Sequence, residues 1–167
     1  MIVVSNTSPL TNLAAIGQFE LLQRLFSEIY IPTIVESELL AGGNTWPGAI
    51  EVKNATWIQM KLVGNQPLVD ALRLDLDRGE SEAIALALEL KADLVLLDEQ
   101  AGRYAAQHFS LKVMGVVGLL IRAKKLGYIA EVQPLLKALR QQAGFYLSDA
   151  VYQHALELAD EQTKMSS

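Results

Sequence analysis

The stretch Leu94-Val95-Leu96-Leu97-Asp98-Glu99 is the part of this sequence that most clearly indicates its fold. Its first four residues form a continuous apolar run, which is typical of a strand buried on both faces of a parallel sheet. Two acidic side chains follow the run directly. The stretch therefore predicts an inner β-strand with carboxylates at its carboxyl end.

The rest of the sequence alternates short apolar segments with longer segments of helical periodicity. This alternation predicts a three-layer α/β/α fold with a short parallel sheet of about five strands. The predicted strands span residues 2–4, 29–31, 57–60, 94–97 and 112–114. The predicted helices span residues 10–16, 19–26, 34–40, 68–76, 80–90, 100–108, 115–125, 131–142 and 148–161, and residues 41–48 are expected to form a loop.

Length and composition predict one well-filled domain. The sequence has 167 residues, of which 51% are hydrophobic and 20% are charged, and this balance excludes a largely disordered chain. We expect a single domain over residues 1–167, with residues 131–167 as its C-terminal helical part. The sequence has no cysteine, which excludes disulfides, zinc-thiolate sites and cysteine nucleophiles.

The N-terminal segment lacks the pattern of a membrane span or an export signal. Residues 1–19 carry no charged side chain, but polar residues at 5–8, 11 and 12 interrupt the apolar stretch. A span needs roughly 20 apolar residues, and a signal peptide needs basic residues before its apolar part. We therefore predict a cytoplasmic protein with no membrane partner.

Polar side chains directly follow two of the predicted strands. Asn6 follows the first strand, and Asp98 and Glu99 follow the fourth. Ligands of open parallel sheets bind outside the carboxyl ends of the strands, so these residues are the first candidates for a site. The alternative for an aspartate after a strand is a cap on the next helix.

Two glutamates lie on the predicted helix that follows Pro32. At about 100° per residue, Glu36 and Glu38 point about 200° apart and cannot face the same site. Relative to the apolar stripe through Val35 and Leu39, Glu38 falls inside the stripe and Glu36 at its edge. We therefore expect Glu38 to point toward buried surface, where a salt bridge, a loop cap or a bound cation would each compensate its charge.

Two further glutamates open the predicted helix 80–90. The body of this helix is apolar almost all round, so it is expected to be buried. The helix dipole alone explains an acid in the first turn, and this is the simplest interpretation of Glu80. Glu82 directly precedes the apolar body and is expected to point toward the sheet.

The candidate acids share one kind of chemistry. Oxygen ligands without histidine or cysteine favour Mg²⁺ or Mn²⁺, and such ions assist the hydrolysis of phosphodiesters. The two histidines, His108 and His154, lie in predicted helices and are expected to be surface or packing residues. The candidate ligands come from four separate elements and are Asn6, Glu38, Glu82 and Asp98.

Four motifs in this sequence resemble those of the PIN-domain family in order, spacing and residue types. The closest resemblance is to the prokaryotic PIN-like branch, and Gly115-Val116-Val117-Gly118 fits that branch too, so the resemblance runs from residue 2 to about residue 160. The motifs are Val3-Val4-Ser5-Asn6-Thr7-Ser8-Pro9-Leu10, Pro32-Thr33-Ile34-Val35 leading to Glu38-Leu39, Gly79-Glu80-Ser81-Glu82-Ala83-Ile84-Ala85-Leu86-Ala87, and Leu96-Leu97-Asp98-Glu99 with Gly102-Arg103.

The resemblance implies a metal-dependent endoribonuclease that hydrolyses phosphodiester bonds in RNA. It implies Mg²⁺ or Mn²⁺ as the cofactor, a frequent role as the toxin of a toxin–antitoxin pair, and a homodimer, with an antitoxin protein as a further partner. The residues that correspond to the family's four acidic ligands are Asn6, Glu38, Glu82 and Asp98. Supporting roles are expected for Ser8, in place of a hydroxyl of the family, and for Glu80 and Glu99.

One position departs from the family pattern. The first ligand of the family is most often aspartate, whereas Asn6 offers a carbonyl oxygen without a negative charge. The alternative to a ribonuclease is therefore a catalytically impaired PIN-like module that binds RNA or a protein. A small anionic ligand at the strand ends is a third possibility, but the sequence has no glycine-rich phosphate loop.

The charge distribution adds candidates for RNA contact. Residues 70–99 carry an excess of acidic side chains, whereas residues 100–140 carry an excess of basic ones. A basic region beside an acidic metal centre would attract a phosphate backbone, although solvated helix faces explain the same pattern. For Arg103, the alternative to a contact with RNA is an ion pair with Glu99, four residues earlier. The candidate RNA-binding residues are Arg103, Arg122, Lys124 and Lys125.

The helices between Leu10 and Phe26 offer a candidate dimer face. They are strongly apolar for a segment near the start of the chain. Burial in the protein's own core would explain the same composition.

Overall fold

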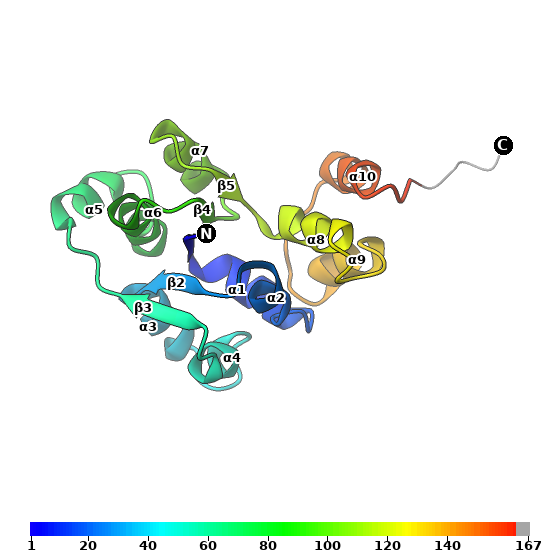
Figure 1. Cartoon of the computed structure of the whole chain (residues 1–167), viewed down its shortest axis with the longest axis horizontal. Helices are drawn as coiled ribbons and strands as arrows, with labels where there is room; N and C mark the ends of the chain where they lie inside the picture. Colours follow the sequence, from blue (N-terminus) through cyan, green and yellow to red (C-terminus); the bar gives the residue numbers. More distant parts are fainter. Residues whose placement is uncertain (163–167) are drawn as a thin grey trace.

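A computed structural model describes residues 1–162 of the chain and shows a five-stranded, all-parallel sheet between helices (Figure 1). The strand order is β3-β2-β1-β4-β5. The predicted α/β fold with a short parallel sheet is therefore confirmed. The strands are β1 (Val3–Ser5), β2 (Ile29–Pro32), β3 (Ile58–Lys61), β4 (Leu94–Leu96) and β5 (Val113–Met114).

The helices follow the predicted order with one addition. The additional helix is α4, six residues long, which directly follows the predicted loop 41–48. It was missed because one and a half turns are too short to show helical periodicity. The helices are α1 (Thr7–Ala15), α2 (Leu21–Phe26), α3 (Thr33–Ala41), α4 (Ala49–Asn54), α5 (Gln66–Leu72), α6 (Arg78–Leu90), α7 (Gln100–His108), α8 (Val116–Lys125), α9 (Gln133–Gln141) and α10 (Asp149–Leu158).

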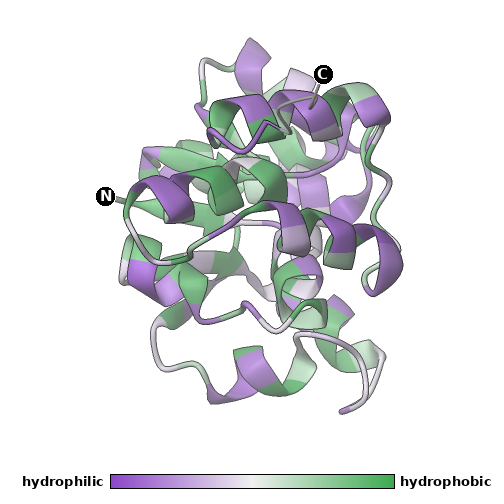
Figure 2. Ribbon diagram, turned by 90° about the vertical axis from the view of Figure 1, so that its right-hand side faces the viewer, coloured by the Kyte–Doolittle hydropathy of each residue, from purple (hydrophilic) through white to green (hydrophobic). Residues whose placement is uncertain are grey.

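Alternate residues of the central strands face two separate apolar clusters. Val3 and Leu96 belong to one cluster, whereas the neighbouring Val4 and Val95 belong to the other. This alternation is the two-residue period of a strand whose two faces are both buried. The clusters on the two faces of the sheet make the three layers of the fold, and Figure 2 shows hydrophobic and hydrophilic residues side by side on individual helices.

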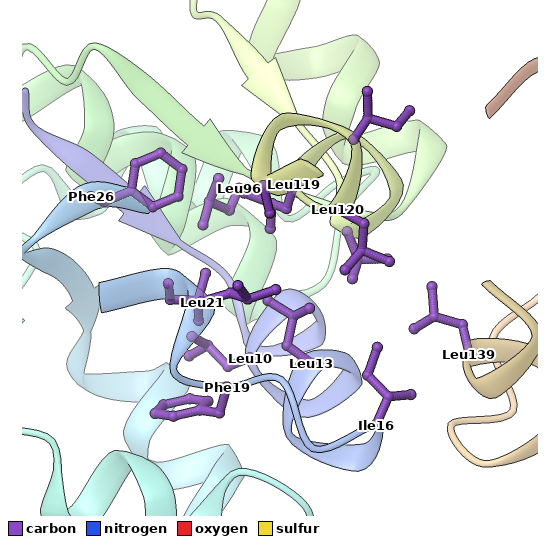
Figure 3. Packing of buried hydrophobic residues seen from close by; sticks show 14 of the residues in the cluster. Leu10, Leu13, Ile16, Phe19, Leu21, Phe26, Leu96, Leu119, Leu120 and Leu139 are labelled. Atoms are coloured by element: carbon purple, nitrogen blue, oxygen red, sulfur yellow. The ribbon is translucent and has the colours of Figure 1, made fainter. Parts of the chain in front are cut away.

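The larger cluster contains the N-terminal helices that were considered as a dimer face. Leu10, Leu13 and Leu22 have no exposed surface, and they belong to the same cluster as Leu119 and Leu120 of α8. Figure 3 shows Leu10, Leu13, Leu119 and Leu120 in this cluster. The protein's own core therefore buries these leucines.

The C-terminal helices dock on the same cluster. Leu136 and Leu139 of α9 and Leu156 of α10 are fully buried in it. The carboxylate of Glu161 accepts hydrogen bonds from the N–H groups of Val132 at 2.7 Å and of Gln133 at 3.0 Å, at the start of α9. Helices α9 and α10 are therefore part of the packed body of the protein.

No helix within residues 1–162 is both long enough and apolar enough to span a bilayer.

Candidate functional site

The carboxyl ends of β1 and β4 place two of the candidate residues at one edge of the sheet. The two strands pair in parallel with Ser5 opposite Leu96, and the N–H of Asn6 donates to the carbonyl of Leu96 at 3.1 Å. Asp98 follows two residues after Leu96. This edge is where open parallel sheets bind their ligands.

Asp98 is held by hydrogen bonds from two helices. Its Oδ2 accepts from Ser8 Oγ at 3.1 Å and from Asn12 Nδ2 at 3.0 Å, and its Oδ1 accepts from the N–H of Val116 at 2.7 Å. Burial raises the pKa of Asp98, and these hydrogen bonds and the charge of Arg103 oppose that shift. The carboxylate thus meets the first turn of α8 and does not cap α7, the helix that follows it in sequence.

Asn12 is a site residue that the sequence analysis missed. It is buried, and its Nδ2 also donates to Ser8 Oγ at 3.1 Å. Residues four apart share one face of a helix, so the position of Asn12 after Ser8 was a usable signal. A polar residue four positions after Ser8 on the same helix indicates a side chain on the same face as Ser8.

Asn6 and Glu38 meet beside Gly79 at the start of α6. A Cβ at Gly79 would lie 2.9 Å from Asn6 Oδ1, 2.9 Å from Glu38 Oε1 and 3.0 Å from Glu38 Oε2. Among the described residues, Asn6 Oδ1 is buried and has no hydrogen-bond partner. The hydroxyl of Thr7, which was also missed, donates to Glu38 Oε2 at 2.5 Å.

Glu38 does not point toward buried surface, and the prediction of its direction was wrong. Glu38 is exposed, and Glu36 is the more buried of the two acids. Only Val35 and Leu39 of α3 are fully buried, so the apolar side of this short helix is narrow and Glu38 lies outside it. Its carboxylate nevertheless binds the Thr7 hydroxyl and lies beside Gly79, as the Asn6 side chain does.

Glu82 is buried within α6, as its position before the apolar body indicated. Glu82 is 3% exposed, and its Oε2 lies 3.5 Å from Nε of Arg78, one helical turn earlier. Within residues 1–162 this oxygen has no hydrogen-bond partner. The Arg78 side chain is 54% exposed, so its ion pair offsets only part of the cost of burying this charge.

Glu80 is as deeply buried as Glu82, which the helix-dipole interpretation did not predict. Its Oε2 lies against Gly102 of α7, where a Cβ would collide with it, and has no hydrogen-bond partner in the described part of the chain. Burial raises the pKa of Glu80 to about 7, and the carboxylates of Asp77 and Glu99 act in the same direction. Asp77 caps α6 by accepting from the N–H of Glu80 at 2.8 Å.

Arg103 lies beside Asp98. A Cβ at Gly115 would be 2.7 Å from Arg103 Nη1 and 3.0 Å from Asp98 Oδ1, so the two groups flank the same glycine. Over residues 1–162, Arg103 forms no salt bridge, and the pairing with Glu99 that was considered is not observed.

The other candidate RNA-binding residues lie elsewhere. The ammonium of Lys124 contacts the Ala159 carbonyl at 2.5 Å and Glu161 Oε2 at 3.0 Å, so it holds the C-terminal segment. Arg122 lines a cavity with Asp93 and other residues that precede the strands, at the opposite edge of the sheet from Asn6. Lys125 is exposed at the end of α8.

The donor set fits a hard divalent cation, although the carboxylates are not gathered into one cluster. Within the described residues, no three or more His, Cys, Asp or Glu side chains are placed together as a metal cage. Buried oxygens of Asn6 and Glu82 nevertheless accept no hydrogen bond from the described residues, and this oxygen-only site suits Mg²⁺ or Mn²⁺. The first of these oxygens belongs to an amide, and amide carbonyl oxygens also bind hard divalent cations.

Comparisons with known proteins agree with this fold. A PilT N-terminus domain protein from the hyperthermophilic archaeon Sulfolobus solfataricus P2 is similar in structure, with a TM-score of 0.52 and 22% identity, over 74% of this chain and 93% of that chain. No curated protein matches the sequence. A family model described as a PIN domain matches residues 2–161. PIN domains are generally a nuclease fold that uses divalent metal ions, and this chain belongs to the PIN-domain family.

Proposed function

We propose that this protein is a metal-dependent endoribonuclease that hydrolyses phosphodiester bonds in RNA. The observation that supports this most is a pair of buried oxygens, Asn6 Oδ1 and Glu82 Oε2, that accept no hydrogen bond within residues 1–162, in a fold whose sheet edge also carries Asp98. Asn6 Oδ1 has no partner in the described part of the chain, and Glu82 Oε2 has only the ion pair with Arg78, so both oxygens are suited to bind a divalent cation.

The residues that would hold Mg²⁺ or Mn²⁺ are Asn6, Glu38, Glu82 and Asp98. When bound, the cation would supply Lewis-acid activation of water and would neutralise charge on the phosphodiester. Ser8, Asn12 and the Val116 N–H keep the Asp98 carboxylate in one orientation. The guanidinium of Arg103 flanks that carboxylate and is suited to contact a phosphate of the RNA.

The neutral Asn6 argues for a second candidate, a PIN-like module that binds RNA or a protein without efficient cleavage. An amide in place of a carboxylate removes one negative charge from the ligand set, which weakens the attraction for a divalent cation. Asn6→Asp restores that charge at a position whose oxygen accepts no hydrogen bond from the described residues. This variant therefore separates the two candidates.

The decisive experiment is cleavage of several single-stranded RNAs with Mg²⁺, Mn²⁺ or EDTA. We expect Asp98→Asn to reduce cleavage by about 100-fold or more, and Asn6→Asp to increase it and to tighten Mn²⁺ binding in calorimetry. Asp70→Asn is the matched control, because Asp70 is an exposed acid of α5 outside the site. Absence of metal-dependent cleavage by both the wild type and Asn6→Asp would overturn the nuclease proposal.

The biological role that we propose is the toxin of a toxin–antitoxin pair in the cytoplasm, acting as a homodimer. This role rests on the family resemblance. It predicts an antitoxin encoded beside this chain, whose co-purification inhibits the cleavage, and a dimeric mass in light scattering. A monomeric mass, or a neighbouring gene product that does not bind, would contradict the corresponding part.

A further inference from the structure

We propose that the pocket between α7, α8 and the loop before α10 binds one nucleobase of single-stranded RNA. This inference rests on the proposed function, because it names how the substrate is held beside Asp98. The occupant is a nucleotide unit whose base stacks on Tyr146 and whose phosphate contacts Arg103.

The pocket directly adjoins the candidate site. It has a volume of about 200 Å³, and Asp98 and Arg103 form part of its wall. Much of the remaining lining is apolar and includes Val117, Phe145 and Tyr146. A cation, an aromatic ring and an apolar floor at one opening are the features that single-stranded nucleic acid binding sites combine.

Tyr146 is strongly exposed although the loop that carries it is fixed. The side chain of Tyr146 is 87% exposed, whereas the next residue, Leu147, is buried. The preceding residue, Phe145, donates its N–H to the Leu139 carbonyl at 2.9 Å. The ring is therefore presented to solvent from a backbone anchored on both sides.

Two further contacts restrain this loop. Arg140 donates to the Leu147 carbonyl from Nε at 3.0 Å and from Nη2 at 2.6 Å, and Ser148 Oγ accepts from the Val151 N–H at 3.1 Å. A loop held in this way loses little backbone freedom when a ligand stacks on the Tyr146 ring. A single exposed tyrosine needs no explanation by itself, but a preorganised one in the wall of a pocket beside a candidate catalytic acid is suited to ligand binding.

The charges favour a nucleotide over an acidic or purely apolar ligand. Arg103 forms no salt bridge within residues 1–162, so its guanidinium is available to an anion. The oxygens of Asp98 accept hydrogen bonds from Ser8, Asn12 and Val116, and these donors offset part of its negative charge beside the pocket. The pocket thus offers donors for a phosphate and a ring face for a base, in continuity with the proposed cleavage site.

The test measures RNA binding separately from cleavage. Fluorescence anisotropy would follow a labelled single-stranded RNA at low salt, in EDTA and in Ca²⁺, against wild type, Tyr146→Ala, Tyr146→Phe and Tyr104→Ala. Loss of one stacked base weakens binding by about 5- to 150-fold, and we expect this for Tyr146→Ala but not for Tyr146→Phe. Tyr104 is the matched control, since it is 74% exposed on α7 and does not line the pocket.

A second ligand separates base stacking from charge. An abasic oligonucleotide of the same length keeps the phosphates, so its affinity should be equal for wild type and Tyr146→Ala. Circular dichroism and melting curves establish that the variants fold. Equal RNA affinity of wild type, Tyr146→Ala and Tyr146→Phe, or no RNA binding by the wild type, would overturn the proposal, as would a Tyr146-dependent affinity only for an antitoxin peptide.

The outcomes also distinguish this proposal from the nuclease proposal. Tyr146-dependent RNA binding without cleavage would support the base pocket and reject the nuclease. Metal-dependent cleavage with no effect of Tyr146→Ala on affinity or rate would support the nuclease and reject the base pocket.

Discussion

At the scale of single residues, a substitution of Gly79 tests the candidate site with little effect on the stability of the fold. Its missing side chain leaves the space in which the oxygens of Asn6 and Glu38 converge. Gly79→Ala would displace these flexible side-chain ends, so we expect a marked loss of metal-dependent cleavage. The free energy of unfolding should change by no more than about 1 kcal/mol, because alanine is the better helix former.

The matched control for this change is Gly118→Ala. Gly118 also lies within a helix, and its Cβ would meet only the flexible Met114 side chain, at 2.9 Å. Cleavage assays and urea unfolding of both variants provide the comparison. Full activity in Gly79→Ala would show that the space between Asn6 and Glu38 is not used.

Glu80 gives a pH dependence of stability with a definite sign. The unfolded chain loses this proton near pH 4.5, whereas the buried carboxyl retains it up to about pH 7. The free energy of unfolding therefore falls as the pH rises through this window. Glutamine stays neutral, so the free energy of unfolding of Glu80→Gln should exceed that of the wild type by about 1 to 3 kcal/mol at about pH 8 in EDTA. At about pH 5 the difference should be less than about 1 kcal/mol.

Chemical denaturation at the two pH values measures this difference. For Asp70→Asn, which alters an exposed acid, the difference in free energy of unfolding from the wild type should be the same at both pH values. A Glu80→Gln variant that is no more stable than the wild type at about pH 8 would show that the folded protein bears no cost for ionising Glu80.

At the scale of elements, a carboxylate from the C-terminal segment caps α9. Glu161 binds the first N–H groups of α9 and the ammonium of Lys124. Burial acts to raise the pKa of Glu161, but these donors outweigh it and lower the pKa. The stabilisation is therefore present above the ordinary pKa of glutamate and is lost as the pH falls through the lowered pKa.

Glu161→Gln should cost about 1 to 3 kcal/mol near neutral pH, because hydrogen bonds to a charged acceptor are lost. The difference from the wild type should disappear in acid, where the wild-type carboxyl is also neutral. Thermal unfolding across pH measures this, with the more exposed Glu157→Gln as control. A constant difference at all pH values would mean that the charge of Glu161 is not what stabilises the cap.

At the scale of the whole molecule, one core joins the sheet to the C-terminal helices. Leu139 of α9 is fully buried in the same cluster as the strand residues Val3 and Leu96. Leu139→Ala should therefore lower the stability of the entire chain by about 2 to 5 kcal/mol in a single transition. Leu74→Ala, at an 85% exposed position, should have little effect.

Far-ultraviolet dichroism and tryptophan fluorescence provide two probes of this transition. Trp57 packs against Phe19 and reports the N-terminal part of the core. If Leu139→Ala shifts a dichroism transition but leaves the fluorescence transition unchanged, the C-terminal helices unfold separately from the sheet.

The sequence alone determined the layers of this protein and the residues at the strand ends. Apolar runs such as 94–97 and the positions of Asn6 and Asp98 are local properties of the chain, and strand and helix periodicity depends on neighbours within a few residues. The same local information placed Glu82 among the candidates, and the resemblance to the PIN-domain motifs added Ser8. It also sufficed to identify the PIN-domain motifs.

The tertiary structure decided which side chains meet. The burial of Glu80 depends on Gly102 of α7, the role of Asn12 depends on the return of Asp98 beside α1, and Lys124 binds Glu161 far along the chain. The exposure of Glu38 follows from how little of α3 the core covers. These outcomes require contacts between residues distant in sequence, which hydrophobic periodicity within one element does not encode, because it reports burial and not the identity of the partner.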